Sequence, residues 1–315
     1  MRLCVVSLNP ALDAEWRVED VLWEEKNVVH TQRRWPGGKG INVARWLKFL
    51  GADPELLIPL GGATGREISR GLRAQELRAR VIPLAGETRV NVVVTTADGR
   101  QMRFNPPGPK VNALERKHIL RAANFVLSRG ATLILSGALP PGLPAASYAQ
   151  LIRRAHRHGR RAILDCDGDA LVAGVQAKPF LIKPHLHDLS RWSGRTLRSE
   201  RAIIAAARRM SAESGGWILV SLGADGALLV NVRENFAARA TLPPVRVLNT
   251  VGAGDAMLAA AVVKSVGTFS PEELLRHAAA TGTAATQCAA GAFPSRRLGR
   301  ELLRQVRVQV LELSR

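Results

Sequence analysis

Short apolar runs rich in aliphatic residues alternate with longer amphipathic segments along the 315-residue chain. Turn residues follow most of these runs, and a helical pattern then begins. The runs are RLCVVS, ELLIPL, ATLILS, RAILD, PFLI and WILVS. This order predicts a doubly wound α/β domain with a mostly parallel sheet and crossover helices. Ligands of such sheets bind at the carboxyl ends of the strands, so we expect the functional residues there.

Two stretches, about 13–35 and 88–108, have strand-like composition without an intervening helix. The second contains Asp98-Gly99 between two β runs, which is a strong hairpin signal. Strands that leave the main sheet and return would form a small second sheet, and we interpret it as a lid over the site. An antiparallel extension of the main sheet remains the alternative.

Composition indicates an ordinary globular protein, with 46% hydrophobic and 23% charged residues. No linker or repeat divides the chain, so we expect a single domain over 1–315. No apolar stretch reaches the ~18 residues of a membrane span, and the N-terminal apolar run is too short for a secretory signal. The three cysteines are far apart and are predicted to be buried thiols in a cytoplasmic protein.

The chain is strongly basic, with 45 Lys and Arg against 26 Asp and Glu, a net charge of +19. One arginine cluster alternates with apolar residues in a way that predicts a single amphipathic helix. It comprises Arg153, Arg154, Arg157, Arg160 and Arg161. Nucleic-acid or acidic-membrane binding is the functional hypothesis, and a solvated helix face is the alternative. No aromatic residue interleaves with the cluster, so we expect neither partner.

Two glycine-rich segments mark predicted helix starts. In PGGKGINVAR, Gly37, Gly38 and Gly40 surround Lys39, so that backbone N–H groups and a positive charge can approach an anion. In NTVGAGDAML, Gly252, Ala253 and Gly254 precede Asp255. Their N–H groups could stabilise a transferred anionic group, and Asp255 could accept a proton. Alternatively, Asp255 only complements the helix dipole.

Six motifs in this order resemble the ribokinase-like phosphofructokinase-B family of sugar kinases, from residue 3 to about 293. They are NPALD (9–13), GGKGINVAR (37–45), LSGALPPG (135–142), LIKP (181–184), SLGADGALL (221–229) and TVGAGDAM (250–257). Within the family, the second and last are most similar to the branch of 1-phosphofructokinase and tagatose-6-phosphate kinase. The resemblance implies a three-layer α/β/α fold with a small β-sheet lid, which can pair with a second subunit's lid as a homodimer.

Carried over by position, the resemblance assigns the residues to three groups. Asp255 becomes the general base, with Gly252, Ala253 and Gly254 as the anion hole. The sugar-phosphate side comprises Asp13, Gly37, Gly38, Lys39, Asn42, Arg89, Arg103 and Ser136. The nucleotide side, which would bind ATP, comprises Lys183, Ser221, Gly223, Gly226 and Thr250. A bidentate arginine suits the phosphate already on the sugar.

The sequence departs from the family at its magnesium motif, where Asn-x-x-Glu usually follows the lysine-proline pair. Here His185 and Asp188 stand at those positions. The carboxylate is one methylene shorter, and an imidazole replaces an amide oxygen that suited a hard cation. We therefore expect a working but altered Mg²⁺ site, which these two residues would hold through water.

These observations together predict an ATP- and Mg²⁺-dependent kinase that acts on a ketohexose monophosphate. Fructose 1-phosphate going to fructose 1,6-bisphosphate is the first expectation. Tagatose 6-phosphate and fructose 6-phosphate are the alternatives within the class. A sugar-phosphate sensor without catalytic activity is a hypothesis from another class, motivated by His185 and Asp188, and the nucleic-acid binder is a third.

Overall fold

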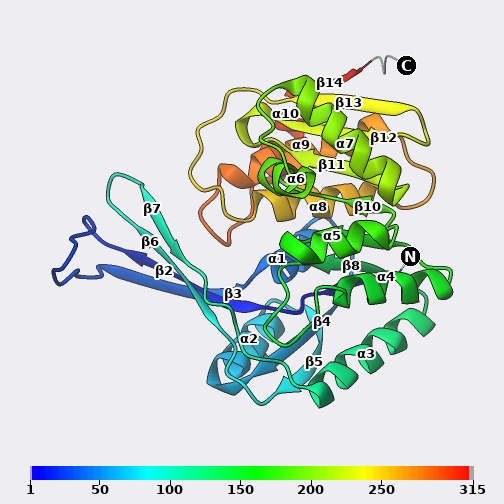
Figure 1. Ribbon diagram of the computed structural model, residues 1–315. Coiled ribbons are helices and arrows are strands. Elements are labelled where there is room, and N and C mark those ends of the chain that lie inside the picture. The colour runs from blue at the N-terminus through cyan, green and yellow to red at the C-terminus, as the bar shows by residue number, and fades with distance from the viewer. Residues whose placement is uncertain (1, 312–315) are drawn as a thin grey trace.

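The computed structural model describes residues 2–311, and its main element is a ten-stranded sheet (Figure 1). The strand order is β14-β13-β12-β11-β10-β9-β8-β1-β4-β5, and the seven strands from β11 to β5 are parallel. Their bounds are β1 (Arg2–Val6), β4 (Pro54–Gly61), β5 (Arg78–Leu84), β8 (Ala131–Ser136), β9 (Ala162–Asp165), β10 (Leu181–Ile182), β11 (Trp217–Ser221), β12 (Ala227–Asn231), β13 (Phe236–Thr241) and β14 (Arg307–Val310). The six runs singled out in the sequence are all strands of this sheet.

Helices cover both faces of the sheet, because neighbouring residues of a strand such as Cys4 and Val5 belong to two different apolar clusters. One face carries α1 (Lys39–Phe49), α2 (Gly62–Ala74), α8 (Ala253–Lys264), α9 (Pro271–Thr286) and α10 (Arg296–Gln305). The other carries α3 (Ala113–Ser128), α4 (Ser147–Arg157), α5 (Gly168–Gln176), α6 (Leu186–Ser193) and α7 (Glu200–Ser214). The predicted α/β fold with helices on both faces is confirmed.

A separate four-stranded sheet extends from the body, in blue and cyan in Figure 1. It has the order β3-β2-β6-β7, from β2 (Ala11–Arg17), β3 (Thr31–Gly37), β6 (Val90–Thr95) and β7 (Gln101–Phe104). The Asp98-Gly99 turn joins β6 to β7 as predicted, with Gly99 at φ 88°. These strands form their own sheet, so the alternative of an extension of the main sheet is wrong. The antiparallel strands of the main sheet are β12 to β14 instead.

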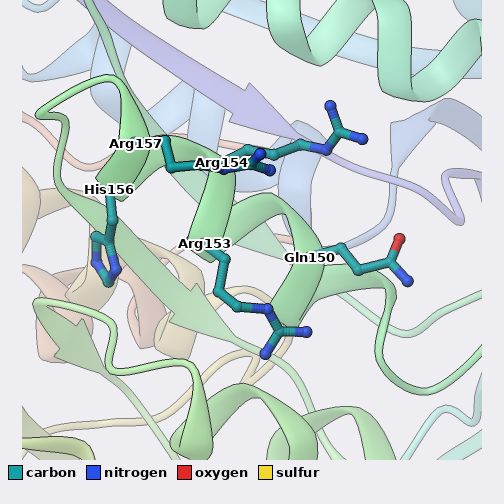
Figure 2. Close-up of a pocket in the computed structure, with 5 residues that line it drawn as sticks. All are labelled: Gln150, Arg153, Arg154, His156 and Arg157. Carbon is teal, nitrogen blue, oxygen red and sulfur yellow. The ribbon is translucent and has the colours of Figure 1, made fainter.

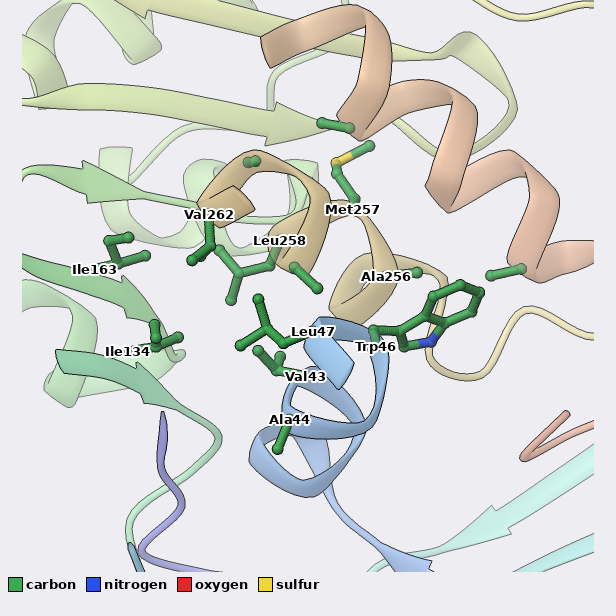
Figure 3. Packing of buried hydrophobic residues seen from close by; sticks show 14 of the residues in the cluster. Val43, Ala44, Trp46, Leu47, Ile134, Ile163, Ala256, Met257, Leu258 and Val262 are labelled. Carbon is green, nitrogen blue, oxygen red and sulfur yellow. The ribbon is translucent and has the colours of Figure 1, made fainter. Parts of the chain in front are cut away.

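Helices α1 and α8 pack against each other over strands β8 and β9 (Figure 3). Val43 and Leu47 of α1 lie beside Leu258 and Val262 of α8. Helix α8 is buried on nearly all sides from residue 255 to 262, so it has no polar face to present to water. This contact brings the first turns of two helices together although they are far apart in the sequence.

The arginine cluster does not lie on a single helix, contrary to the prediction. Helix α4 ends at Arg157, and Gly159 then adopts a left-handed conformation at φ 64°. Arg160 and Arg161 therefore follow the helix, on the segment that leads into β9. The apolar side of α4 is buried as predicted. Between residues 2 and 311, no helix is long and apolar enough to cross a bilayer.

Candidate active site

Two helix starts meet at the centre of the site. Helix α1 follows Gly38, whose φ of 85° suits glycine, and α8 follows Gly252 at φ 84°. In the first turns of these helices, the side-chain Nδ2 of Asn42 donates a hydrogen bond of 2.9 Å to Oδ2 of Asp255. The structure thus unites the two glycine-rich motifs that the sequence indicated separately.

The carboxyl of Asp255 is buried, and this burial raises its pKa to about 6. The negative charge of Asp165 raises the pKa further, while the hydrogen bond from Asn42 and the charges of Lys39 and Lys183 lower it. A carboxyl with a pKa near neutrality is a stronger base than an exposed aspartate and is still ionised at pH 7. Its environment therefore fits proton acceptance better than simple helix capping.

Asp165 is a site residue that the sequence analysis missed. It ends β9 and is buried, and its Oδ1 lies 3.3 Å from Lys183 Nζ and 3.6 Å from Lys39 Nζ. Burial acts to raise its pKa, but the two ammonium groups outweigh burial and hold the pKa below the usual value. The signal in the sequence was an acid at the carboxyl end of a buried strand, where ligands bind.

Ser136 ends the neighbouring strand β8 and is completely buried. Its hydroxyl donates to Oδ2 of Asp165 at 3.5 Å. The structure therefore shows Ser136 as a buried partner of Asp165, and its contact with the sugar stays a prediction.

Asp13 and the residues around it form the opposite side of the site, at the base of the smaller sheet. Asp13 is buried, and its Oδ1 accepts a hydrogen bond of 2.9 Å from Asn91 on β6. Burial raises the pKa of Asp13, although Asn91 and the backbone N–H of Gly38 stabilise its ionised form. A Cβ at Gly37 would overlap the Asp13 carboxylate, so this position requires glycine. Asn91 was not among the predicted site residues.

The two predicted phosphate-binding arginines take separate positions. The Arg89 guanidinium donates to the carbonyl oxygens of Pro106 (2.7 Å) and Asn9 (3.0 Å), and its charge stabilises ionised Asp13. Arg103 on β7 is exposed, and it donates to Oγ1 of Thr250 at 3.1 Å, just before α8. Arg103 thus connects the smaller sheet to the segment that leads into α8.

Lys183 lies between the nucleotide side and α8. Its ammonium is 3.4 Å from where a Cβ of Gly254 would stand, next to the start of α8. Ser221 ends β11 and is bridged to residue 185. Gly223 and Gly226 follow with φ of 64° and 93°, and a Cβ at Gly226 would overlap a carbonyl oxygen of β13. The turn is therefore a tight, glycine-dependent one beside Lys183.

His185 and Asp188 form a capping box at the start of α6. Oδ2 of Asp188 accepts the backbone N–H of His185 at 3.0 Å, and Nδ1 of His185 accepts the N–H of His187 at 3.2 Å. Burial lowers the pKa of His185. With Nδ1 occupied, Nε2 is the ring nitrogen left for a ligand, and Oδ1 of Asp188 lies 3.9 Å from Nδ1 of His187. Their metal role stays a prediction.

Comparison with known proteins identifies the family of this chain. The profile of the pfkB family of carbohydrate kinases matches residues 4–297. The chain belongs to this family. It is 33% identical to 1-phosphofructokinase of Escherichia coli (strain K12), over 90% of each chain. It is 35% identical to the ATP-dependent 6-phosphofructokinase isozyme 2 of the same organism, over 91% of this chain and 93% of that one.

Solved structures agree with the sequence comparisons. The fold superposes on phosphofructokinase-2 from Escherichia coli in complex with fructose-6-phosphate with a TM-score of 0.89, at 32% identity over 96% of this chain and 98% of that one. The chain is thus a carbohydrate kinase with a ribokinase-like fold, as the six motifs predicted, and sugar kinases of this family take the phosphoryl group from ATP.

Proposed function

We propose that this kinase transfers the γ-phosphoryl group of ATP to a hydroxyl of a ketohexose monophosphate, with fructose 1-phosphate as the first substrate. The contact between Asn42 and Asp255 carries the proposal. This hydrogen bond holds a buried carboxylate of raised pKa between Asp13, which we expect to bind the sugar phosphate, and Lys183, which we expect to bind the nucleotide. Two 1-phosphofructokinases, from Bacillus subtilis and Escherichia coli, are among the relatives, at 31% and 33% identity.

The proposed mechanism uses Asp255 as the general base. Its carboxylate accepts the proton of the sugar hydroxyl while that oxygen attacks the γ-phosphorus and the bond to the β-phosphate oxygen breaks. The N–H groups at the start of α8 then stabilise the charge on the transferred group: those of Gly252 and Gly254, and that of Ala253 once it leaves its long bond of 3.4 Å to the Thr250 carbonyl oxygen. Lys183, beside Gly254, adds a fixed positive charge at the same place.

Asp165 acts through the two lysines. It is buried, and its carboxylate holds the ammonium groups of Lys183 and Lys39 at fixed positions. Its negative charge also raises the pKa of Asp255. Asp165 is therefore a positioning residue that orients the cations and adjusts the base.

The residues present fit a magnesium ion that keeps most of its water. Within the described residues, no cluster of three or more His, Cys, Asp or Glu side chains could hold a metal directly. Mg²⁺ commonly uses only one or two carboxylates together with substrate phosphates. Oδ1 of Asp188 would hold its water ligands, with His185 contributing through Nε2. When bound, Mg²⁺ neutralises phosphate charge.

Fructose 6-phosphate is the second candidate substrate, favoured by the 35% identity to a 6-phosphofructokinase. Either sugar phosphate would place its phosphate among Lys39, Arg89 and Arg103. Tagatose 6-phosphate stays an alternative for the same reason.

The smaller sheet also supports pairing of two subunits as a homodimer. The segment between β2 and β3 exposes several large apolar side chains, and Phe104 at the end of β7 is exposed as well. They are Leu22, Trp23, Val28, Val29 and Phe104. Burying these side chains against a second copy would remove apolar surface from water and cover the site. We infer that the sheet acts as the lid in such a pair.

The test is ADP release from Mg·ATP with each candidate sugar phosphate and with unphosphorylated sugars, beside Asp255→Asn. Turnover with one phosphorylated ketohexose, abolished by the substitution, supports the proposal and identifies the substrate. Binding of a sugar phosphate without turnover in Mg²⁺ or Mn²⁺ would instead favour the sensor hypothesis.

A further inference from the structure

A long basic surface lies on α3 and α4, outside the site. From residue 116 to residue 164 the chain contains nine Lys and Arg, three His and no Asp or Glu. The nine cations are Arg116, Lys117, Arg121, Arg129, Arg153, Arg154, Arg157, Arg160 and Arg161. All are exposed except Arg154, which is half-buried and donates to Asn124 Oδ1 at 2.9 Å. The guanidinium of Arg161, however, lies over the Phe180 ring and donates to the Ser265 carbonyl oxygen at 3.1 Å, on the face of the sheet that carries α8. We call the other eight side chains the α3–α4 basic surface.

The α3–α4 basic surface differs from the other arginine-rich helices of this protein. The arginines of α7 and α10 are mixed with acids and form ion pairs such as Arg209–Glu213 and Arg297–Glu301. None of the nine cations forms an ion pair with a carboxylate of the described chain. A generally arginine-rich composition would not by itself remove acids from one surface. The segregation therefore indicates a selected positive face.

Tertiary structure also brings an aromatic ring to this surface. A groove of about 640 Å³ between α3 and α4 is lined by Phe125 together with Arg121, Asn124, Ser128, Arg154, Arg157 and His158. Phe125 is 44% exposed, and the Arg80 guanidinium lies 4.4 Å from its ring centre. A second hollow of about 440 Å³ lies along α4, where the arginine side chains extend outward from the helix in different directions (Figure 2).

This surface lies away from the active site. Helices α3 and α4 run into the starts of β8 and β9, whereas Asp165 and Ser136 stand at the carboxyl ends of those strands. In a parallel sheet these are opposite edges. Arg129, Arg157 and Arg160, at the ends of the two helices, therefore lie toward the edge opposite the site, whereas Arg116 and Lys117 stand on the first turn of α3. A ligand held by Arg129, Arg157 and Arg160 would leave the kinase site open.

We propose that the α3–α4 basic surface binds single-stranded nucleic acid through its phosphate backbone, without sequence preference. Helix α3 has 16 residues and is ~24 Å long. Along that length the helix can follow several consecutive phosphates of one strand. Guanidinium groups without a carboxylate partner suit phosphate oxygens. Phe125 is the aromatic side chain of the groove that a base could contact, beside Arg129 and the Arg80 that pairs with Glu55.

The same surface fits other polyanions less well. Membrane binding requires apolar side chains that enter the lipid, and the surface has only Phe125 among its groove residues. Inorganic polyphosphate would use the arginines but would gain nothing from Phe125. A duplex would need an element that enters one of its grooves, whereas the cations of this surface lie along two helices and line a groove between them.

The experiment is fluorescence anisotropy of a labelled oligodeoxythymidine over a range of salt concentrations. The variant Arg153→Ser/Arg157→Ser/Arg160→Ser removes three cations from the surface. The matched control, Arg296→Ser/Arg300→Ser/Arg304→Ser, removes three exposed cations from α10 and gives the same net charge. Thermal melting and kinase turnover, which the distant site should keep, check that both variants are folded.

The proposal expects the surface variant to weaken binding on the order of ten- to hundredfold and to lower the salt slope by about 2, with ~0.7 per lost phosphate contact. The control variant should bind as the unmodified protein does. Equal weakening in both variants, or binding that salt does not affect, would overturn the proposal.

A second variant, Phe125→Ser, distinguishes binding of nucleic acid from binding of inorganic polyphosphate. It should weaken binding of the oligonucleotide and leave inorganic polyphosphate binding unchanged. Binding of polyphosphate alone, tighter binding of a duplex, or binding only to phosphatidylserine vesicles would replace single-stranded nucleic acid as the ligand.

Discussion

Asn42 and Asp255 are 213 positions apart in the sequence, and a hydrogen bond of 2.9 Å joins their side chains at the centre of the site. The bond exists because α1 and α8 pack against each other through their apolar side chains (Figure 3), which brings their first turns together. It both orients the Asp255 carboxylate and favours its ionised form.

The first prediction concerns the pH dependence of catalysis. Since the proposed base must be ionised, kcat/KM should fall as the pH drops through about 6. Asn42→Ala removes a hydrogen bond that lowers the pKa of Asp255, so the acid limb should move to higher pH. The measurement is kcat/KM for the best sugar phosphate as a function of pH.

Asn91→Ala is the matched control for this prediction. Asn91 binds Asp13 rather than Asp255, so its loss should raise the sugar KM without moving the acid limb. An acid limb that stays in place in Asn42→Ala would show that Asp255 does not set it.

The second prediction concerns Asp255→Asn, which should lower kcat by ~10²–10⁴ and yet stabilise the fold. The pKa of Asp255 is about 6 in the folded protein against 3.8 for a free aspartate side chain, so ionisation opposes folding. Protonated Asp255 therefore stabilises the folded state. This stabilisation is complete below the pKa of the unfolded chain and is lost as the pH rises through about 6.

The neutral asparagine should therefore raise Tm above about pH 6, on the order of a few degrees, and give no gain near pH 4. Paired melting curves of the two proteins across this range measure the difference. A Tm gain that is equal at all pH values would contradict the assigned pKa.

The third prediction concerns the buried pair of Lys183 and Asp165. Lys183→Met leaves a buried carboxylate with only the more exposed Lys39, and Asp165→Asn leaves a buried ammonium, so each should cost about 3 kcal/mol of unfolding free energy. The double variant should lose much less unfolding free energy than the two single variants lose together. Urea denaturation of all four proteins gives the double-mutant cycle. Strictly additive losses of unfolding free energy would mean that the two charges do not stabilise each other.

The fourth prediction uses the glycine behind Asp13. In Gly37→Ala the new Cβ would overlap the Asp13 carboxylate, which must move, so the KM for the sugar phosphate should rise about tenfold or more. Gly299→Ala is the control, because nothing lies within 4 Å of its Cβ and its helix should gain slightly. Equal kinetic constants in both variants would mean that Asp13 does not bind the sugar phosphate.

The fifth prediction concerns the metal. His185→Asn with Asp188→Glu lengthens the carboxylate and replaces the imidazole, so half-maximal rate should need less free Mg²⁺. The measurement is rate against free Mg²⁺ and Mn²⁺, with Asp169→Asn on α5 as an exposed-acid control. An unchanged metal dependence would mean that residues 185 and 188 do not contact the hydrated ion.

Much of the fold could be predicted because its signals are local. Apolar runs such as ATLILS read as buried strands, Asp98-Gly99 as a hairpin, and Gly38 and Gly252 as helix starts, since each depends on neighbouring residues only. The separate sheet could not be told from an extension of the main one, because strand partners are chosen by long-range pairing.

The sequence by itself determined the strands, the helix starts and the acid at each candidate position. Only the tertiary structure decided which side chains meet. The order β1-β8-β9 sets Asp165 under Lys39 and Lys183 and hides Ser136, and the packing of α3 on α4 brings Phe125 to the arginines. Such contacts depend on which distant elements pack together, and a local sequence pattern does not predict that packing.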